Sequence, residues 1–165
     1  MATVFTIGVY GTAQEPFFDA LLGAGIDAFL DIRRRRAVRG RRYAFANARR
    51  LMDGLARRGI PYMRVLDLSP DRSLLALQHD ADAVAKQRGS QRMQLDPRYI
   101  ERYRSEVLDR FDFTALAQSL RGVRAPVLFC IERFPSACHR SLAAPPLARA
   151  LETDEVVHLI PESAA

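Results

Sequence analysis

The stretch covering residues 127–140 holds more reactive side chains than any other window of this 165-residue chain. It contains both cysteines, Cys130 and Cys138, together with the carboxylate of Glu132 and the imidazole of His139. An ionised thiol is a nucleophile, a carboxyl can exchange protons with a substrate, and an imidazole can accept the proton of a thiol. The stretch is therefore the first candidate for a functional site.

Cys138, His139 and Arg140 stand where a helix is expected to begin. The free amides and the dipole at a helix N-terminus stabilise a thiolate and bind anions. Cys138 is therefore the candidate nucleophile, and Glu132 is the candidate general acid or base. His139 is the candidate base for the thiol, but neighbours at the start of a helix usually point apart, which favours a role in orienting a loop or a ligand. The alternative for Glu132 is a structural ion pair that fixes its loop.

Other uses of the thiols can be judged from spacing. A zinc site made of Cys130, Cys138, His139 and His158 would lack the short knuckle spacing of structural sites, so we expect no metal and no cofactor. A phosphatase or rhodanese type of anion loop needs an arginine at its far end, but neither the fifth nor the sixth residue after Cys130 is one. A disulfide between the two cysteines would be rare in a reducing cytosol. Burial as a small apolar side chain explains Cys130 as well as chemistry does.

The elements that would position these residues are short apolar strands separated by helical stretches. This alternation is typical of a mainly parallel sheet with helices on both faces, a three-layer α/β/α arrangement of about five strands. The length suits one hydrophobic core, so we expect a single α/β domain over residues 1–165. The expected strands are residues 4–7, 28–33, 60–66, 125–130 and 156–160, and the expected helices begin near Thr12, Asn47, Ser69, Pro97, Phe113 and Cys138.

The expected helix after Cys138 contains two consecutive prolines, Pro145 and Pro146. A proline inside a helix lacks the amide donor and costs about 3 kcal/mol or more. We therefore predict a kink or a restart of this helix near Ala144.

Ligands of such folds bind beyond the carboxyl ends of the strands. Residues from three expected strands would meet there. Arg33 and Arg140 would hold an anion, because a planar guanidinium matches a phosphate group with two hydrogen bonds. The residues predicted to bind the ligand are Gly8, Tyr10, Asp31, Arg33, Cys130 and Arg140, beside the catalytic candidates Glu132, Cys138 and His139.

Positive charge is concentrated in one part of the chain. The net charge is +6, and the window from Arg33 to Arg58 alone holds eleven arginines and one acidic residue, Asp53. Such a face favours a phosphate-bearing ligand or a polyanionic partner. Our leading hypothesis is a protein that binds a phosphate-bearing small molecule, such as a nucleotide, or a nucleic-acid end, and whether it also processes this ligand as an enzyme is left open. The alternatives are a non-enzymatic nucleic-acid-binding module and a protein-interaction domain with an acidic partner.

Composition also bears on location. Two cysteines are too few for a secreted disulfide scaffold of this length, and no basic region precedes an apolar stretch near Met1. No apolar run approaches the roughly 20 residues of a spanning helix. We therefore expect a cytoplasmic protein without membrane contact, and the sequence does not specify its oligomeric state.

Several motifs in order resemble a known family. The pattern Cys130-x-Glu132 followed by Cys138-His139-Arg140 is similar to the signature of the bacterial and archaeal family catalogued as domain of unknown function 488. The resemblance implies a three-layer α/β fold with the motif residues gathered at one end of the sheet, and it implies no established reaction. After the third strand the chain departs from the Leu-Gly-Gly that is common in the family. The other matching motifs are Thr6-Ile7-Gly8, Asp31-Ile32-Arg33, Phe45-Ala46-Asn47, Gly59-Ile60-x-Tyr62 and Val156-x-His158-Leu159.

Overall fold

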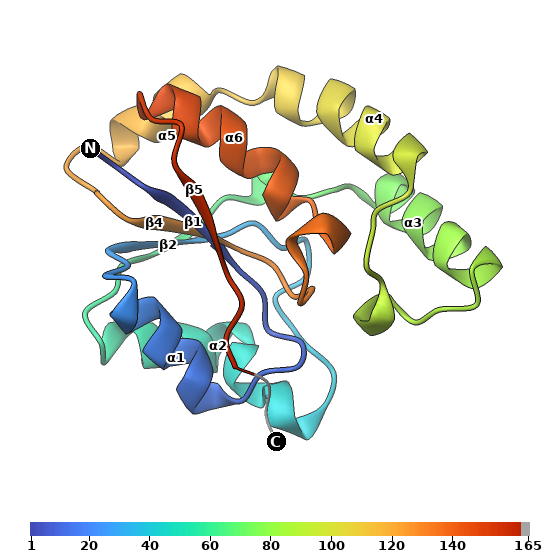
Figure 1. Ribbon diagram of the computed structural model, residues 1–165, viewed down its shortest axis with the longest axis horizontal. Helices are drawn as coiled ribbons and strands as arrows, with labels where there is room; N and C mark the ends of the chain where they lie inside the picture. The colour runs from blue at the N-terminus through green and yellow to red at the C-terminus, as the bar shows by residue number, and fades with distance from the viewer. Residues whose placement is uncertain (163–165) are drawn as a thin grey trace.

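The computed structural model describes residues 1–162, whose five strands form one sheet (Figure 1). Their order across the sheet is β3-β2-β4-β1-β5, and every neighbouring pair is parallel. The predicted parallel sheet is therefore confirmed, although each strand after the first is shorter than expected. The strands are β1 (Val4–Ile7), β2 (Ala28–Asp31), β3 (Tyr62–Arg64), β4 (Pro126–Phe129) and β5 (Val156–Leu159).

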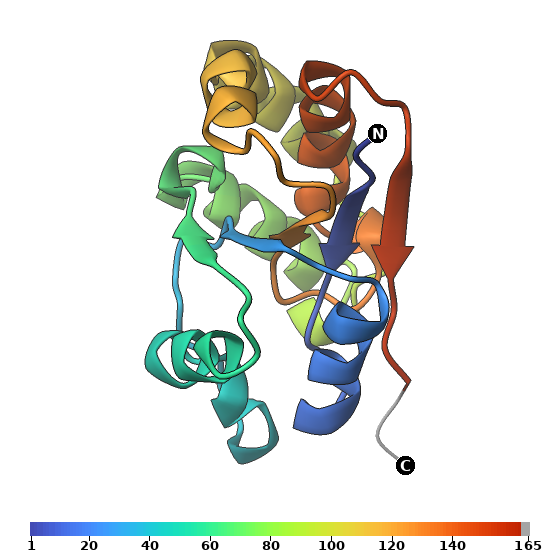
Figure 2. The same ribbon diagram turned by 90° about the vertical axis from the view of Figure 1, so that its left-hand side faces the viewer.

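Helices cover both faces of this sheet, which confirms the three-layer arrangement (Figure 1, Figure 2). One face carries α1 (Gln14–Gly23) and α2 (Ala48–Ala56), and the other side carries α3 (Arg72–Val84), α4 (Pro97–Glu106), α5 (Phe113–Ser119) and α6 (Arg140–Ala150). A short 3-10 turn at Arg41–Ala46 follows β2, and another at Pro135–Ala137 precedes α6. None of the helices within residues 1–162 is long and apolar enough to cross a bilayer.

Two apolar layers hold the helices to the sheet. On one face, the ring of Phe129 packs against Phe17 of α1 and Phe29 of β2, with centroid distances of 5.7 Å and 5.0 Å. On the other face, Leu128 lies in one cluster with Leu147 of α6. A parallel strand that is buried on both sides needs apolar residues at successive positions, and β4 is buried throughout. The core therefore fixes the end of β4, where the candidate site begins.

The helix α6 is uninterrupted, although Pro145 and Pro146 lie inside it. The restart predicted near Ala144 is therefore wrong, and the alternative of a kink there stays a prediction. Ala144 and Leu147 are fully buried, whereas Pro145 is exposed. Burial of the inner face outweighs the local cost of the prolines, and a carbonyl that lacks its amide donor on the outer face can bind water.

The helices α1 and α3 begin at residues other than those predicted. Asp71, rather than Ser69, precedes α3, and its carboxylate accepts a hydrogen bond from the amide of Leu74 at 2.8 Å. Ala13 precedes α1, and the hydroxyl of Thr12 donates instead to backbone carbonyls. Several polar residues near a helix start can compete for the capping role, so sequence patterns locate it only to within one or two positions.

Candidate thiol site at the carboxyl edge of the sheet

The carboxyl ends of β2, β4 and β1 lie side by side, because these strands are neighbours in the sheet. After β2, the amide of Ile32 donates to the carbonyl of Phe129 at 3.2 Å, and after β4, the amide of Cys130 donates to the carbonyl of Ile7 at 3.3 Å. Hydrogen bonding thus continues past the strand ends and aligns the residues that follow. The residues before α6 reach the same edge, since the ring of His139 contacts Ile32.

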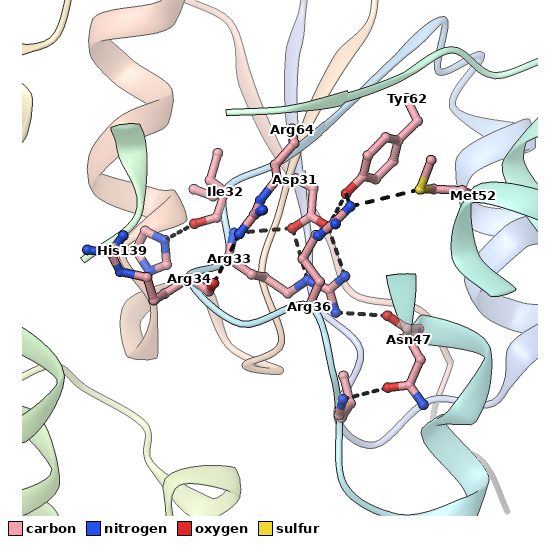
Figure 3. A network of polar contacts seen from close by, with 12 residues as sticks. Asp31, Ile32, Arg33, Arg34, Arg36, Asn47, Met52, Tyr62, Arg64 and His139 are labelled. Atoms are coloured by element: carbon pink, nitrogen blue, oxygen red, sulfur yellow. Dashed lines mark hydrogen bonds and ion pairs between the residues drawn. The ribbon is translucent and has the colours of Figure 1, made fainter. Parts of the chain in front are cut away.

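Cys138 and His139 face each other, with 3.7 Å between Sγ and Nδ1. The second ring nitrogen, Nε2, lies 3.0 Å from the carbonyl oxygen of Ile32 (Figure 3). A carbonyl oxygen only accepts hydrogen bonds, so Nε2 carries a proton and Nδ1 of the neutral ring can accept one from the thiol. The ring of Tyr103 packs edge-on against the imidazole, with 5.4 Å between centroids. The imidazole is therefore held in the tautomer that a base for Cys138 requires.

This orientation corrects the expectation that the two neighbours point apart. Cys138 has an extended backbone (φ −142°, ψ 145°), whereas His139 has a helical one (φ −62°, ψ −19°). The helix α6 begins only at Arg140. Cys138 therefore lies before the helix, and the change of backbone conformation between the two residues turns their side chains toward each other.

The two thiols differ in their tendency to ionise. Burial raises the pKa of Cys138, but a hydrogen bond from Cys130 opposes this effect. The charges of His139 and Arg140 lower the pKa further, so that it lies well below the ordinary value. The pKa of Cys130 is raised well above that value by its hydrogen bond to Cys138 and by burial. Cys138 is therefore the thiolate of the pair, and Cys130 is the neutral thiol.

Glu132 holds its proton more tightly than an ordinary carboxyl. Burial raises its pKa to about 8 in spite of the Arg92 guanidinium, and the charge of Cys138 acts in the same direction as burial. Arg92 Nη2 lies 3.0 Å from Glu132 Oε1, and Arg92 Nη1 lies 2.6 Å from Asp82 Oδ2. The Arg92 guanidinium thus contacts two buried carboxyl groups. Glu132 is therefore protonated at neutral pH and can act as a general acid.

Arg92 is a site residue that sequence reasoning missed. It belongs to the connection between α3 and α4, residues 85–96, which we call the cover segment. Its Nε donates to the carbonyl of Ala137 at 3.2 Å, and the amide of Leu95 donates to the carbonyl of Ser136 at 3.1 Å. Arg92 lies forty positions before Glu132, and no motif or periodicity marks it. Only the folded structure brings the cover segment against the turn that precedes Cys138.

Arg140 and Gly8 build the loop that carries Glu132. The fully buried Arg140 guanidinium donates from Nη1 to the carbonyl of Glu132 at 2.6 Å and from Nη2 to the carbonyl of Arg133 at 3.1 Å. A Cβ at Gly8 would lie 1.7 Å from the same Glu132 carbonyl oxygen and 3.2 Å from Arg140 Nη1. Only glycine allows this approach. Both residues therefore lie at the predicted edge, where they hold backbone atoms in place.

Asp31 and Arg33 form a second, separate network at the same edge (Figure 3). Asp31 Oδ1 accepts from Arg33 Nε at 2.9 Å, and Asp31 Oδ2 accepts from Arg33 Nη2 at 2.8 Å and from the Tyr62 hydroxyl at 2.7 Å. Arg33 Nη1 donates to the carbonyl of Ala46 at 2.8 Å. Both side chains are buried, at 0% and 2% exposure. The pair ties β2 to β3 and to the turn Arg41–Ala46.

Tyr10 is the one predicted site residue that is not fully enclosed. Burial raises the pKa of this half-buried phenol, and the negative charges that Glu132 and Cys130 carry once they ionise add to the effect. Its ring meets Tyr43 edge-on, with 5.3 Å between centroids. Tyr10 therefore reaches the accessible surface, where it packs against Tyr43.

The fold brings three possible metal ligands together. The ligand atoms of Cys130, Cys138 and His139 all lie within 4.8 Å of one another. His158 is not among them, because its Nδ1 lies 2.7 Å from the hydroxyl of Thr6. Two thiolates and one imidazole would leave a tetrahedral ion with an open position. The four-ligand set considered from the sequence is therefore not assembled.

The thiols are enclosed. Cys138 is 2% exposed and Cys130 is 8% exposed. A cavity of about 680 Å³ lies elsewhere, between β3 and the region of α4 and α5, and none of the predicted site residues lines it. A reactant therefore meets Cys138 only if it is very small or if the cover segment moves.

Comparison with known proteins identifies a family but no characterised relative. A search of curated proteins found no match, and neither did a search of solved structures. Residues 13–146 match the family described as "Domain of unknown function DUF488", and this range includes both cysteines, Glu132 and the Cys-His-Arg motif. The chain therefore belongs to the family described as domain of unknown function DUF488.

Proposed function

We propose that the protein is a thiol-dependent enzyme in which Cys138 is the nucleophile, His139 is its base and Glu132 is a proton donor. One observation carries the proposal, namely the position of the imidazole. Its Nδ1 lies 3.7 Å from the Cys138 sulfur, while Nε2 is bound to the Ile32 carbonyl at 3.0 Å. A base oriented by a third group is the arrangement that activates cysteine nucleophiles.

The proposed reaction starts from an ion pair, in which the proton of Cys138 has already passed to His139 Nδ1. The resulting thiolate attacks an electrophilic centre of the substrate and forms a covalent intermediate, while the imidazolium and the nearby Arg140 stabilise its charge beforehand. Glu132 supports the next step, because a carboxyl with a pKa of about 8 still holds a proton at neutral pH. It would give this proton to the leaving group.

We place recognition of a phosphate-bearing substrate on the exposed part of the arginine-rich segment, residues 33–58, rather than on the buried side chains of Arg33 and Arg140. The guanidiniums of those two residues are buried and bind protein oxygens. The segment that follows β2 leaves the sheet at the same edge as the thiols and carries exposed guanidinium groups, which suit an anionic ligand. Its exposed arginines are Arg35, Arg39, Arg41, Arg42, Arg49, Arg50 and Arg57.

Labelling with iodoacetamide tests the nucleophile. We expect the native protein at neutral pH to be alkylated on Cys138, as located by peptide mass spectrometry. Cys130→Ser should keep this label, and Cys138→Ser should lose it. If Cys130 alone is labelled, or if both cysteines react only after denaturation, Cys138 is not the nucleophile.

A second candidate function rests on the exposed arginines alone, namely a non-enzymatic nucleic-acid-binding module. Binding of DNA or RNA should then weaken steeply with salt, because phosphate contacts release counterions. Replacing Arg35, Arg41 and Arg42 by Gln should reduce affinity, whereas Arg121→Gln, an exposed arginine outside the segment, should not. Cys138→Ser should have no effect on this binding. Absence of binding at low salt would exclude the candidate and leave an acidic protein as the partner of this face.

A further inference from the structure

Cys130 has no part in the proposed reaction, yet it lies directly beside the nucleophile. Its sulfur, the sulfur of Cys138 and a ring nitrogen of His139 lie within 4.8 Å of one another, and both cysteines are free thiols. Cys130 follows the buried strand β4, and its amide donates to the carbonyl of Ile7. The backbone position of Cys130 is therefore fixed by the sheet.

We propose that Cys130 is the resolving thiol of Cys138, so that hydrogen peroxide converts the two residues into a disulfide and a dithiol converts them back. This inference rests on the proposed function, because only a thiolate at Cys138 would react with the peroxide. It adds a substrate class and a form of regulation, since the disulfide removes the nucleophile reversibly.

The chemistry balances in two steps. In the first, the Cys138 thiolate attacks one peroxide oxygen, an S–O bond forms, the O–O bond breaks, and the leaving hydroxide takes a proton and departs as water. Cys138 is then a sulfenic acid. In the second, the Cys130 thiol loses its proton, its sulfur attacks the Cys138 sulfur, and the S–O bond breaks with release of a second water. The two cysteines are oxidised by two electrons, and the peroxide is reduced.

The enclosure of the site selects a small oxidant. Cys138 and Cys130 are 2% and 8% exposed, and the cover segment is hydrogen-bonded through Arg92 and Leu95 to the turn before Cys138. Hydrogen peroxide is little larger than water and can reach such a sulfur through small fluctuations. A protein disulfide or a bulky hydroperoxide would require the cover segment to leave.

The surrounding groups suit both steps. Arg140 and the imidazole of His139 stabilise the attacking thiolate, and the protonated Glu132 lies near enough to influence both sulfurs and can neutralise the leaving hydroxide. Cys130 remains a neutral thiol, so that no second negative charge opposes the first ionisation. Seven residues separate the two cysteines, and Arg140 anchors the start of the loop between them through the carbonyls of Glu132 and Arg133.

Oxidation of the full chain with a slight excess of hydrogen peroxide, followed by N-ethylmaleimide blocking and intact mass measurement, tests the proposal. The wild type should lose two hydrogens and both alkylation sites, and dithiothreitol should restore them. Cys130→Ser should instead accumulate a Cys138 sulfenic acid that dimedone traps. Cys138→Ser should lose thiols at least about tenfold more slowly, because Cys130 is not ionised.

The outcomes separate this inference from the proposed function. If the wild type accumulates sulfenic or sulfinic acid on Cys138 without a disulfide, Cys130 is not the resolving thiol. The assignment of Cys138 as the nucleophile is then unaffected. If neither cysteine reacts faster than a free thiol, both proposals fail. If the purified protein holds stoichiometric zinc that is lost in Cys130→Ser, then Cys130, Cys138 and His139 are metal ligands. The inference that the two cysteines form a reversible disulfide is then overturned.

Discussion

Two buried arginine–carboxylate networks stand at the same edge of the sheet, and they differ in how completely the carboxyl is bound. Asp31 receives hydrogen bonds on both oxygens, from Arg33 and from Tyr62. Glu132 is bound on Oε1 by Arg92, which it shares with Asp82. In the first network both oxygens of the carboxylate have hydrogen-bond donors. In the second network burial raises the pKa of Glu132 to about 8.

The difference separates a structural pair from a reactive group. Asp31, with donors on both oxygens and a partner in bidentate geometry, fixes β2 to its neighbours. A carboxyl with one shared arginine beside a thiolate keeps its proton and can transfer it. The same residue types therefore serve the fold at one place and, in our proposal, chemistry at the other.

The largest expected effect is on folding, from removal of Asp31. Asp31→Ala should lower the free energy of unfolding by about 3–5 kcal/mol, because it leaves the Arg33 guanidinium buried without a counter-ion. Glu132→Ala should cost clearly less, because the removed group is neutral and Arg92 keeps Asp82 as its partner. Denaturant unfolding of both variants measures the two values. Equal losses would remove the distinction between the networks.

The next effect concerns the loop that presents Glu132. In Gly8→Ala the new Cβ would lie 1.7 Å from the Glu132 carbonyl oxygen, so the loop must move. We expect a loss of about 1–3 kcal/mol in unfolding free energy and slower alkylation of Cys138. Gly23→Ala is the matched control, since nothing lies within 4 Å of a Cβ there. A Gly8→Ala variant as stable and as reactive as the control would show that the loop is not held as described.

A third expected effect is a pH dependence of stability. The pKa of Glu132 is about 8 in the folded chain and 4.5 ordinarily, so the folded state binds this proton more tightly. The resulting stabilisation is fully present below pH 4.5 and is lost as the pH rises to about 8. Unfolding of the wild type and of Glu132→Gln, which stays neutral, should be compared across this range. The stability of the wild type should fall relative to the variant, and a constant difference would show that Glu132 is already ionised at pH 4.5 and above.

The fold was predictable from the sequence because buried strands and amphipathic helices leave local patterns. The placement of Glu132 after β4, and of Cys138 and His139 near the start of α6, followed from the same patterns. The sequence does not reveal which way a guanidinium points. Arg33 and Arg140 were therefore expected to face a ligand, although they bind protein oxygens. Arg92 comes from a connection without periodicity, and only tertiary packing brings it to Glu132.

The error at α6 has a similar origin. The local rule that prolines break helices is sound, but it takes no account of the buried face that holds this helix against the sheet. The mutual orientation of Cys138 and His139 also depended on where the helix begins, and a shift of two residues reverses that conclusion.

A pH titration of the thiolate ultraviolet absorbance tests the central claim most directly. The difference between wild type and Cys138→Ser isolates the Cys138 thiolate, and the same difference in a His139→Gln background removes the base. We expect the wild-type midpoint to lie well below the ordinary thiol pKa of about 8.5 and to rise when His139 is replaced. A wild-type midpoint at or above that value, unchanged by His139→Gln, would contradict the assignment of Cys138 and His139 as a reactive pair.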